Sequence, residues 1–200
     1  MEIADATPVK LVPKVGTTTM IERSDVIESY NDGYEVITDS YDYESGEEDS
    51  TFYDEWYIYG LAVNMTKAKL GNYFEVQGDG RYELITTKSN GGYGTGCIVK
   101  VYDRNGTIDD ESDDIFVEQF FIVIFGDLDG NGRITQLDYN EALNDLTKKD
   151  WSANRGGIAY MKKAADLNDQ NGRITQLDVN ALGQVVARAS TIDQKTGKAS

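Results

Sequence analysis

The sequence predicts an α+β protein of two domains: a β-rich N-terminal domain with one short helix at residues 1–125, and an all-α C-terminal domain at residues 126–190. Residues 191–200 would form a tail. Three observations support this division. β-prone segments are concentrated before residue 126, an eight-residue motif is repeated after it, and a helical pattern follows each copy of the motif. The 200 residues, 40% of them hydrophobic, suffice for a buried core.

The N-terminal domain is predicted to contain about six strands separated by glycine-containing turns. One short helix is expected over 66–73, with Leu70 and Tyr73 on the same face. Residues 22–55 are acidic and show little periodicity, which is typical of a solvated insertion. The strands are expected at residues 17–21, 56–59, 74–76, 82–85, 97–102 and 116–125.

Composition excludes several kinds of function. With 35 acidic and 19 basic residues the net charge is −16, which repels nucleic acid and anionic membranes and attracts cations or basic protein surfaces. The absence of histidine excludes Ser–His–Asp and Cys–His catalysis and histidine metal ligation. The single cysteine, Cys97, excludes an internal disulfide and a cysteine-rich zinc site, and we expect it to be buried in its strand.

The start of the chain leaves two interpretations open. Residues 1–6 have neither the basic nor the apolar region of a signal peptide, and the apolar run at 120–125 is too short for a membrane-spanning helix. The protein is therefore either cytosolic or a fragment, lacking its signal peptide, of a longer secreted chain.

An octapeptide, Asn-Gly-Arg-Ile-Thr-Gln-Leu-Asp, occurs at residues 131–138 and again without change at 171–178. Acidic residues precede each copy, and a helical pattern follows each one. Two copies are too few for a solenoid, so we interpret the repeat as a duplicated loop–helix unit.

The first copy has the spacing of an EF-hand-type calcium loop. Calcium prefers six to eight oxygen ligands, which alternate side chains of a turning loop can supply. Glycine at position 6 allows the sharp bend, and position 7 contributes its backbone carbonyl, so its side chain is free to vary. The predicted ligands are Asp127, Asp129, Asn131, the carbonyl of Arg133, and Asp138, with Gly132 at position 6.

The second copy departs from this spacing. Counting back from Asp178 places Leu167 at position 1, where it cannot coordinate a cation. A 13-residue loop beginning at Asp166 avoids this, and Asp169 would replace Asn168 if the latter points outward. The second site would have fewer carboxylates and bind calcium less tightly. Its predicted ligands are Asp166, Asn168, Asn171, the carbonyl of Arg173, and Asp178.

A loop with only an exiting helix, present twice, resembles the type I dockerin module over residues 126–190. The resemblance implies an all-α dockerin domain in which two units pack antiparallel around two calcium ions, with a short intermediate helix at 157–166. It also implies binding to a cohesin of a scaffolding or cell-surface protein, in a cellulosome-like complex for polysaccharide degradation. The β-rich segment is similar to the X-type or Ig-like accessory modules that precede dockerins.

The resemblance also implies which residues contact a cohesin. Positions 10 and 11 of each loop would contribute, together with a basic residue ten positions after each loop. Alternatively, Leu137 and Leu177 are core residues. If they are exposed instead, their identity in both copies would allow the partner to bind in two orientations. The expected contact residues are Gln136, Leu137, Lys148, Gln176, Leu177 and Arg188.

The sequence leaves alternatives to this interpretation open. A run from Gly91 to Gly96 has Walker A spacing, but Cys97 follows in place of lysine, so a tight β-turn is expected. A carbohydrate-active enzyme with a carboxylate pair in the β-domain is possible in principle, although no catalytic motif is present. A calcium-stabilised structural module without a partner is a further alternative. The leading prediction is a non-enzymatic, monomeric, extracellular or cell-surface docking module.

Overall fold

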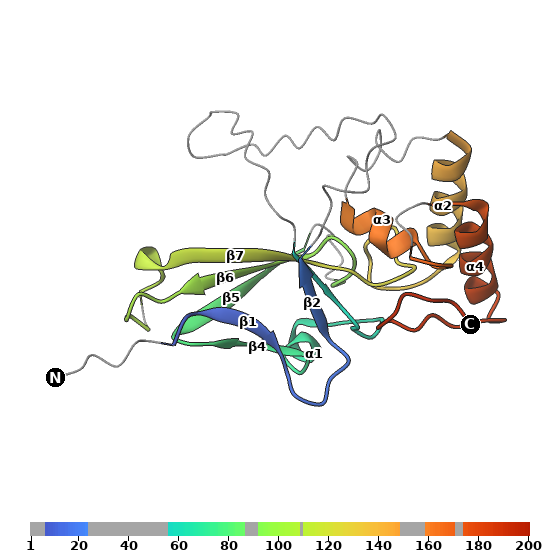
Figure 1. The fold of residues 1–200 in the computed structure, drawn as a ribbon. Helices are drawn as coiled ribbons and strands as arrows, with labels where there is room; N and C mark the ends of the chain where they lie inside the picture. The colour runs from blue at the N-terminus through green and yellow to red at the C-terminus, as the bar shows by residue number, and fades with distance from the viewer. Residues whose placement is uncertain (1–6, 24–55, 87–91, 109, 149–158, 171–173) are drawn as a thin grey trace.

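The computed structural model describes residues 7–23, 56–86, 92–108, 110–148, 159–170 and 174–200. They form a mixed α/β structure dominated by two β-sheets (Figure 1). One sheet has five strands in the order β2-β3-β7-β6-β5, and the other contains β1 and β4. The helices α2, α3 and α4 lie together at the end of the large sheet where β7 finishes (Figure 1).

The elements are short. The strands are β1 (Lys10–Pro13), β2 (Met20–Arg23), β3 (Trp56–Tyr59), β4 (Phe74–Gln77), β5 (Gly80–Ile85), β6 (Ile98–Asp103) and β7 (Ile115–Ile122). The helices are α1 (Lys67–Leu70), the 3-10 helix η1 (Glu111–Asp113), α2 (Gln136–Lys148), α3 (Ala159–Ala165) and α4 (Gln176–Val186).

The centre of the large sheet is the parallel pair β3 and β7, in which Trp56 lies opposite Phe120 and Ile58 opposite Ile122. The remaining neighbours in this sheet are antiparallel. A parallel pair is usually buried on both faces, and the aromatic and β-branched residues of β3 suit that position. Ile58 and Ile122 are both fully buried.

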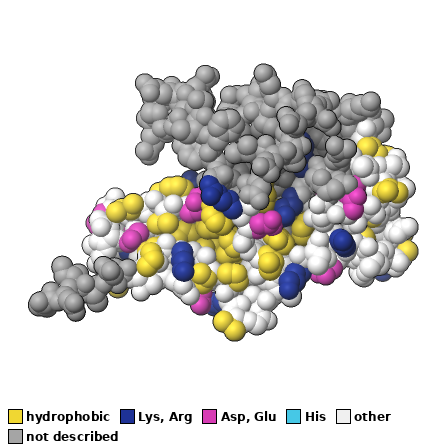
Figure 2. Space-filling view, viewed as in Figure 1, with side chains coloured by type: hydrophobic (Ala, Val, Ile, Leu, Met, Phe, Trp, Pro, Cys, Tyr) yellow, Lys and Arg dark blue, Asp and Glu magenta, His cyan; other side chains and the backbone are white. Residues whose placement is uncertain are grey.

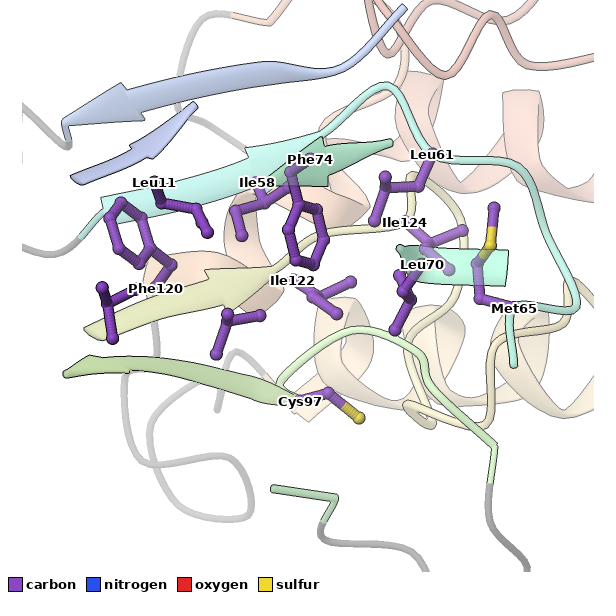
Figure 3. Close-up of a cluster of buried hydrophobic side chains, with 12 residues drawn as sticks. Leu11, Ile58, Leu61, Met65, Leu70, Phe74, Cys97, Phe120, Ile122 and Ile124 are labelled. Carbon is purple, nitrogen blue, oxygen red and sulfur yellow. The ribbon is translucent and has the colours of Figure 1, made fainter. Parts of the chain in front are cut away.

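A hydrophobic core fills the space between the two sheets (Figure 3). Leu11 and Phe74 of the small sheet point toward Ile58 and Ile122 of the large one (Figure 3). Cys97 belongs to the same cluster and is buried, which confirms its predicted environment. This core fixes the strand ends from which the C-terminal loops depart.

The prediction of an all-α dockerin domain within an α+β chain is wrong. The structure is a mixed α/β protein dominated by its sheets, with few short helices. The reason lies in the second core, where Tyr57, Val123 and Phe125 from the sheet and its extension pack with Leu128, Leu167, Val179 and Leu182. Helices of 13, 7 and 11 residues bury little apolar surface by themselves, so they complete their core against the sheet.

Individual strands agree better with the sequence. The strand predicted at 56–59 has the same bounds in the structure, and the helix predicted at 66–73 is reduced to α1, capped by Thr66. The strand β1 was missed, because four residues ending in proline give a weak signal. The domain boundary at residue 126 stays a prediction, and the acidic insertion at 22–55 falls almost entirely outside the described residues.

The surface seen in Figure 2 mixes hydrophobic, basic and acidic side chains over the described part of the sheet. The acidic excess of the chain therefore does not gather into one patch on this part of the face. None of the described helices is long and apolar enough to span a membrane.

Candidate metal centres in the duplicated loops

The first loop begins directly after the extension of β7. Residues 123–128 are all buried, and the N–H of Val123 donates to the carbonyl oxygen of Ile58 at 2.9 Å, which continues the pairing with β3. The chain turns at Gly126, whose φ is +90°, and reaches Asp127. The sheet thus fixes the position of the first predicted ligand.

Three carboxylates of the first loop converge. Asp127, Asp129 and Asp138 each place one oxygen within 4.8 Å of the others. Asp127 and Asp138 are fully buried, and Asp129 is half-buried. Gly132, at the predicted bend, has φ of +81°, a conformation that favours glycine. The structure therefore brings positions 1, 3 and 12 together around one point.

The carboxylate of Asp127 has one satisfied and one unsatisfied oxygen. Its Oδ2 accepts the N–H groups of Thr95 at 2.8 Å and Gly132 at 3.0 Å. Its Oδ1 is buried and has no hydrogen-bond partner. Burial raises the pKa of this carboxyl to about 7; the N–H of Thr95 opposes the rise, and the charge of Asp138 adds to it.

Asp138 closes the loop and begins helix α2. Its Oδ1 accepts the N–H groups of Leu128 and Asp129, and its Oδ2 accepts the N–H and hydroxyl of Thr135. Burial is the main cause that raises the pKa of Asp138. One side chain therefore satisfies the backbone of the loop start and of the helix start at once.

The other two predicted ligands of this loop lie at its rim. Asn131 donates from Nδ2 to Asp129 Oδ2 at 2.6 Å, and its Oδ1 accepts the N–H of Arg133 at 2.8 Å. The side chain of Arg133 is exposed, as expected for a residue that would contribute only its carbonyl. Coordination by Asn131 would require its amide oxygen to leave the N–H of Arg133.

Hydrogen bonds determine the register of the second loop. Asp178 Oδ1 accepts the N–H groups of Leu167 and Asn168, just as Asp138 accepts those of Leu128 and Asp129. Leu167 is fully buried, like Leu128. Asp166 is therefore the equivalent of Asp127, which agrees with the 13-residue loop proposed from the sequence.

The carboxylates of the second loop come from Asp166, Asp169 and Asp178, with one oxygen of each within 4.8 Å of the others. Asp166 and Asp178 are buried, and Asp169 is exposed. The side chain of Asn168, the third ligand of the sequence-based set, is exposed as well. The carboxylate of Asp169, its predicted substitute, lies within the cluster. The remaining predicted ligands, Asn171 and Arg173, lie outside the described residues.

These donor sets fit a hard cation. All the converging atoms are carboxylate oxygens, which suit Ca²⁺ or Mg²⁺ better than soft metals. The unpartnered, buried Asp127 Oδ1 is the kind of atom that a bound cation satisfies, because burying a charged oxygen without a partner is costly. The residues present therefore fit calcium, most completely at the first loop.

Five of the six predicted partner-contact residues are on the surface. Leu137 and Leu177 are 60% and 59% exposed, which excludes the alternative that they are core residues. Gln136 donates to Asn140 at 3.0 Å, and Gln176 donates to Asn180 at 3.0 Å, so both copies have the same local arrangement. Arg188 is exposed beyond α4, and Lys148 ends α2 with its side chain outside the described part of the chain.

The structure adds Thr95 to the first site. Its N–H contacts Asp127 across 32 positions of sequence, and no motif spacing connects the two residues. The glycine run around Thr95 predicts only a tight turn. Searches against family models, curated proteins and solved structures find no match to this chain.

Proposed function

We propose that the protein is a calcium-dependent docking module that binds a cohesin and anchors its parent protein in an extracellular, cellulosome-like complex for polysaccharide degradation. The observation that carries this proposal is the pairing of neighbouring residues in both copies. Buried Asp138 follows exposed Leu137, and buried Asp178 follows exposed Leu177. In each helix, the same first turn thus faces a carboxylate cluster on one side and solvent on the other.

Calcium would supply the positive charge that each carboxylate cluster lacks. In the first loop, Asp127, Asp129 and Asp138 would hold the ion, and in the second loop Asp166, Asp169 and Asp178 would do so. Asp138 and Asp178 also bond the start of their own helices. Ordering of the loops is therefore connected directly to the orientation of the helix turns that carry the leucines.

The packing of α2 against α4 and the exposed residues of their first turns support the proposed docking role. α2 and α4 approach closely enough that a Cβ on Gly183 would lie 2.9 Å from the ring of Tyr139. In each copy an exposed leucine follows an exposed glutamine, which combines an apolar contact with a polar one and suits a protein partner. Because both copies present Gln-Leu in the same setting, a partner could bind in either of two orientations.

An extracellular location is part of the proposal. Loops with three carboxylates and an irregular second copy would bind calcium modestly, and extracellular modules work at far higher calcium concentrations than cytosolic sensors. The oxygen-only donor set and the single buried cysteine do not depend on the redox state of the compartment.

The test is binding to a panel of immobilised cohesins, in calcium and in chelator, with substituted docking residues. Gln136→Ala with Leu137→Ala should leave most of the affinity, as should Gln176→Ala with Leu177→Ala. The fourfold variant should lose cohesin binding while still taking up calcium. Ile108→Ala is the matched control, because Ile108 is 74% exposed in the turn after β6, away from α2 and α4.

The outcomes separate the alternatives. Calcium binding without capture by any cohesin would favour the structural-module reading. Loss of binding from one pair alone would mean that a single face docks. Hydrolysis of a polysaccharide by the full chain would favour the alternative of a carbohydrate-active enzyme.

A further inference from the structure

The turn formed by residues 92–97, which we name the glycine turn, lies against the first loop. It contains Gly92, Gly94, Thr95 and Gly96, and it immediately precedes β6. The N–H of Thr95 donates to Asp127 Oδ2 at 2.8 Å. The same oxygen accepts the N–H of Gly132. Because both donors bind Oδ2, the buried Oδ1 is the oxygen of Asp127 that has no hydrogen-bond partner.

The glycine turn and the loop are in contact along several residues. A Cβ on Gly94 would overlap Asp127 Oδ2 and the backbone nitrogen of Gly132. A Cβ on Gly92 would overlap the carbonyl oxygen of Asn131. Only residues without a side chain allow this approach, so the glycines serve the loop and not merely the turn itself.

The glycine turn is held rigidly on its other side. Thr95 Oγ1 donates to the carbonyl of Ile124 and accepts the N–H of the same residue, both at 3.1 Å. Gly96 donates to Ile122 at 2.9 Å, and Ile122 donates to Cys97 at 2.8 Å. The turn is thus bonded to the end of β7 and its extension.

A second contact joins the loop to the segment that follows β3. The N–H of Asn64, in the segment after β3, donates to the carbonyl oxygen of Gly132 at 2.7 Å. In the second loop, Asp166 Oδ1 accepts the N–H of Gln170, a residue of the same loop.

We infer that the glycine turn is a positioning element of the first calcium site, so that substitutions in this turn weaken calcium affinity at the first loop and not at the second. The inference rests on the proposed binding of calcium. Groups that orient metal ligands commonly affect metal affinity by about 10- to 100-fold when removed. By linkage, calcium at the first loop would also stabilise the glycine turn.

The test uses the full chain with Gly94→Ala, measured by calorimetric titration with calcium. In an Asp166→Ala background, which silences the second loop, Gly94→Ala should weaken calcium affinity at the first loop about tenfold or more. In an Asp127→Ala background, the same substitution should leave the second loop unchanged. Gly71→Ala is the control, since φ is −60° there and an added Cβ would make only ordinary contacts, the nearest at 3.5 Å.

A second variant protects the test against misfolding. The added Cβ of Gly92→Ala would overlap the carbonyl oxygen of Asn131 and not the side chain of Asp127. This variant should also weaken the first site alone, and it replaces Gly94→Ala if that variant fails to fold. Equal weakening of both sites, or no weakening of the first, overturns the inference and leaves the calcium proposal standing. A parent chain that takes up no calcium overturns both.

Discussion

The side-chain amide of Gln194 bonds both backbone groups of Phe125. Its Oε1 accepts the N–H of Phe125, and its Nε2 donates to the carbonyl of Phe125, each at 2.8 Å. Nearby, the N–H of Ala199 donates to the carbonyl of Leu167 at 3.1 Å. The segment expected to be a tail is therefore attached to the entry of both loops.

The first prediction concerns this attachment. Gln194→Ala should lower the free energy of unfolding by about 1–3 kcal/mol, because it leaves the partly buried N–H and carbonyl of Phe125 without their partners. Thermal and denaturant unfolding of the full chain measure this loss. Gln184→Ala, at an exposed position of α4, should change stability by less than about 0.5 kcal/mol. Equal stability of the two variants would contradict the role of Gln194.

The second prediction is that calcium stabilises the protein. A ligand that binds only the folded form adds about 2.7 kcal/mol when it exceeds its dissociation constant a hundredfold. Thermal melts of the full chain should therefore move upward in calcium and downward in chelator. Because the helices share a core with Tyr57 and Phe125, the shift should extend to sheet signals as well. Identical melts in both conditions would rule out calcium binding.

The third prediction is that the two sites are unequal. The first loop has regular spacing and a ligand held by the sheet, whereas the third carboxylate of the second loop, Asp169, is exposed. Asp127→Ala should therefore cost more total calcium affinity than Asp166→Ala, as titration calorimetry can measure. Asp169→Ala should weaken only the second site, and Asn168→Ala should have the smaller effect. If Asn168→Ala weakened the second site more than Asp169→Ala does, Asn168 would be the ligand instead.

The fourth prediction concerns pH in the presence of chelator. The pKa of Asp127 is raised from 3.8 to about 7 in the folded state, so the folded protein holds a proton that the unfolded chain releases. Stability from this group is present in full below about pH 4 and is lost as the pH rises through about 7. Unfolding at pH 5 and pH 8 should show the difference.

The control for this experiment is Asp127→Asn, which keeps the shape of the side chain but does not titrate. Its stability in chelator should depend less on pH over the same interval. Saturating calcium should also reduce the dependence in the parent chain, because the cation replaces the proton. A parent chain whose stability rises between pH 5 and pH 8 in chelator would contradict the raised pKa.

The sequence predicted the local parts of the site well. Regular spacing placed Asp127, Asp129 and Asp138 in one loop, and the duplicated motif indicated that Leu137 and Leu177 share a role. Such features depend on residues that are close in sequence, where ligand spacing in a loop and the helical period can be read directly. The converging carboxylates follow from the loop spacing, and the exposed leucines follow from their place in the first turn of each helix.

The contacts that sequence patterns missed are distant ones. Nothing in the glycine run indicates that Thr95 meets Asp127, or that Gln194 returns to Phe125 across 69 positions. The all-α prediction failed for the same reason: a helix pattern shows that an apolar face must be covered, but not which element covers it. Here part of the cover comes from Tyr57 and Phe125.

The parallel pairing of β3 with β7 has a consequence for the order of folding. Between them the chain makes β4, β5 and β6, so the centre of the large sheet closes only after most of the β-rich part has been synthesised. Long-range pairing of this kind is slow, because a long loop must close before its contacts form. Until β7 has been made, the backbone edge of β3 that pairs with it is exposed, and such unpaired edges are prone to association with other chains. The acidic loop that follows β7 directly is thus made at the moment when the sheet can first close.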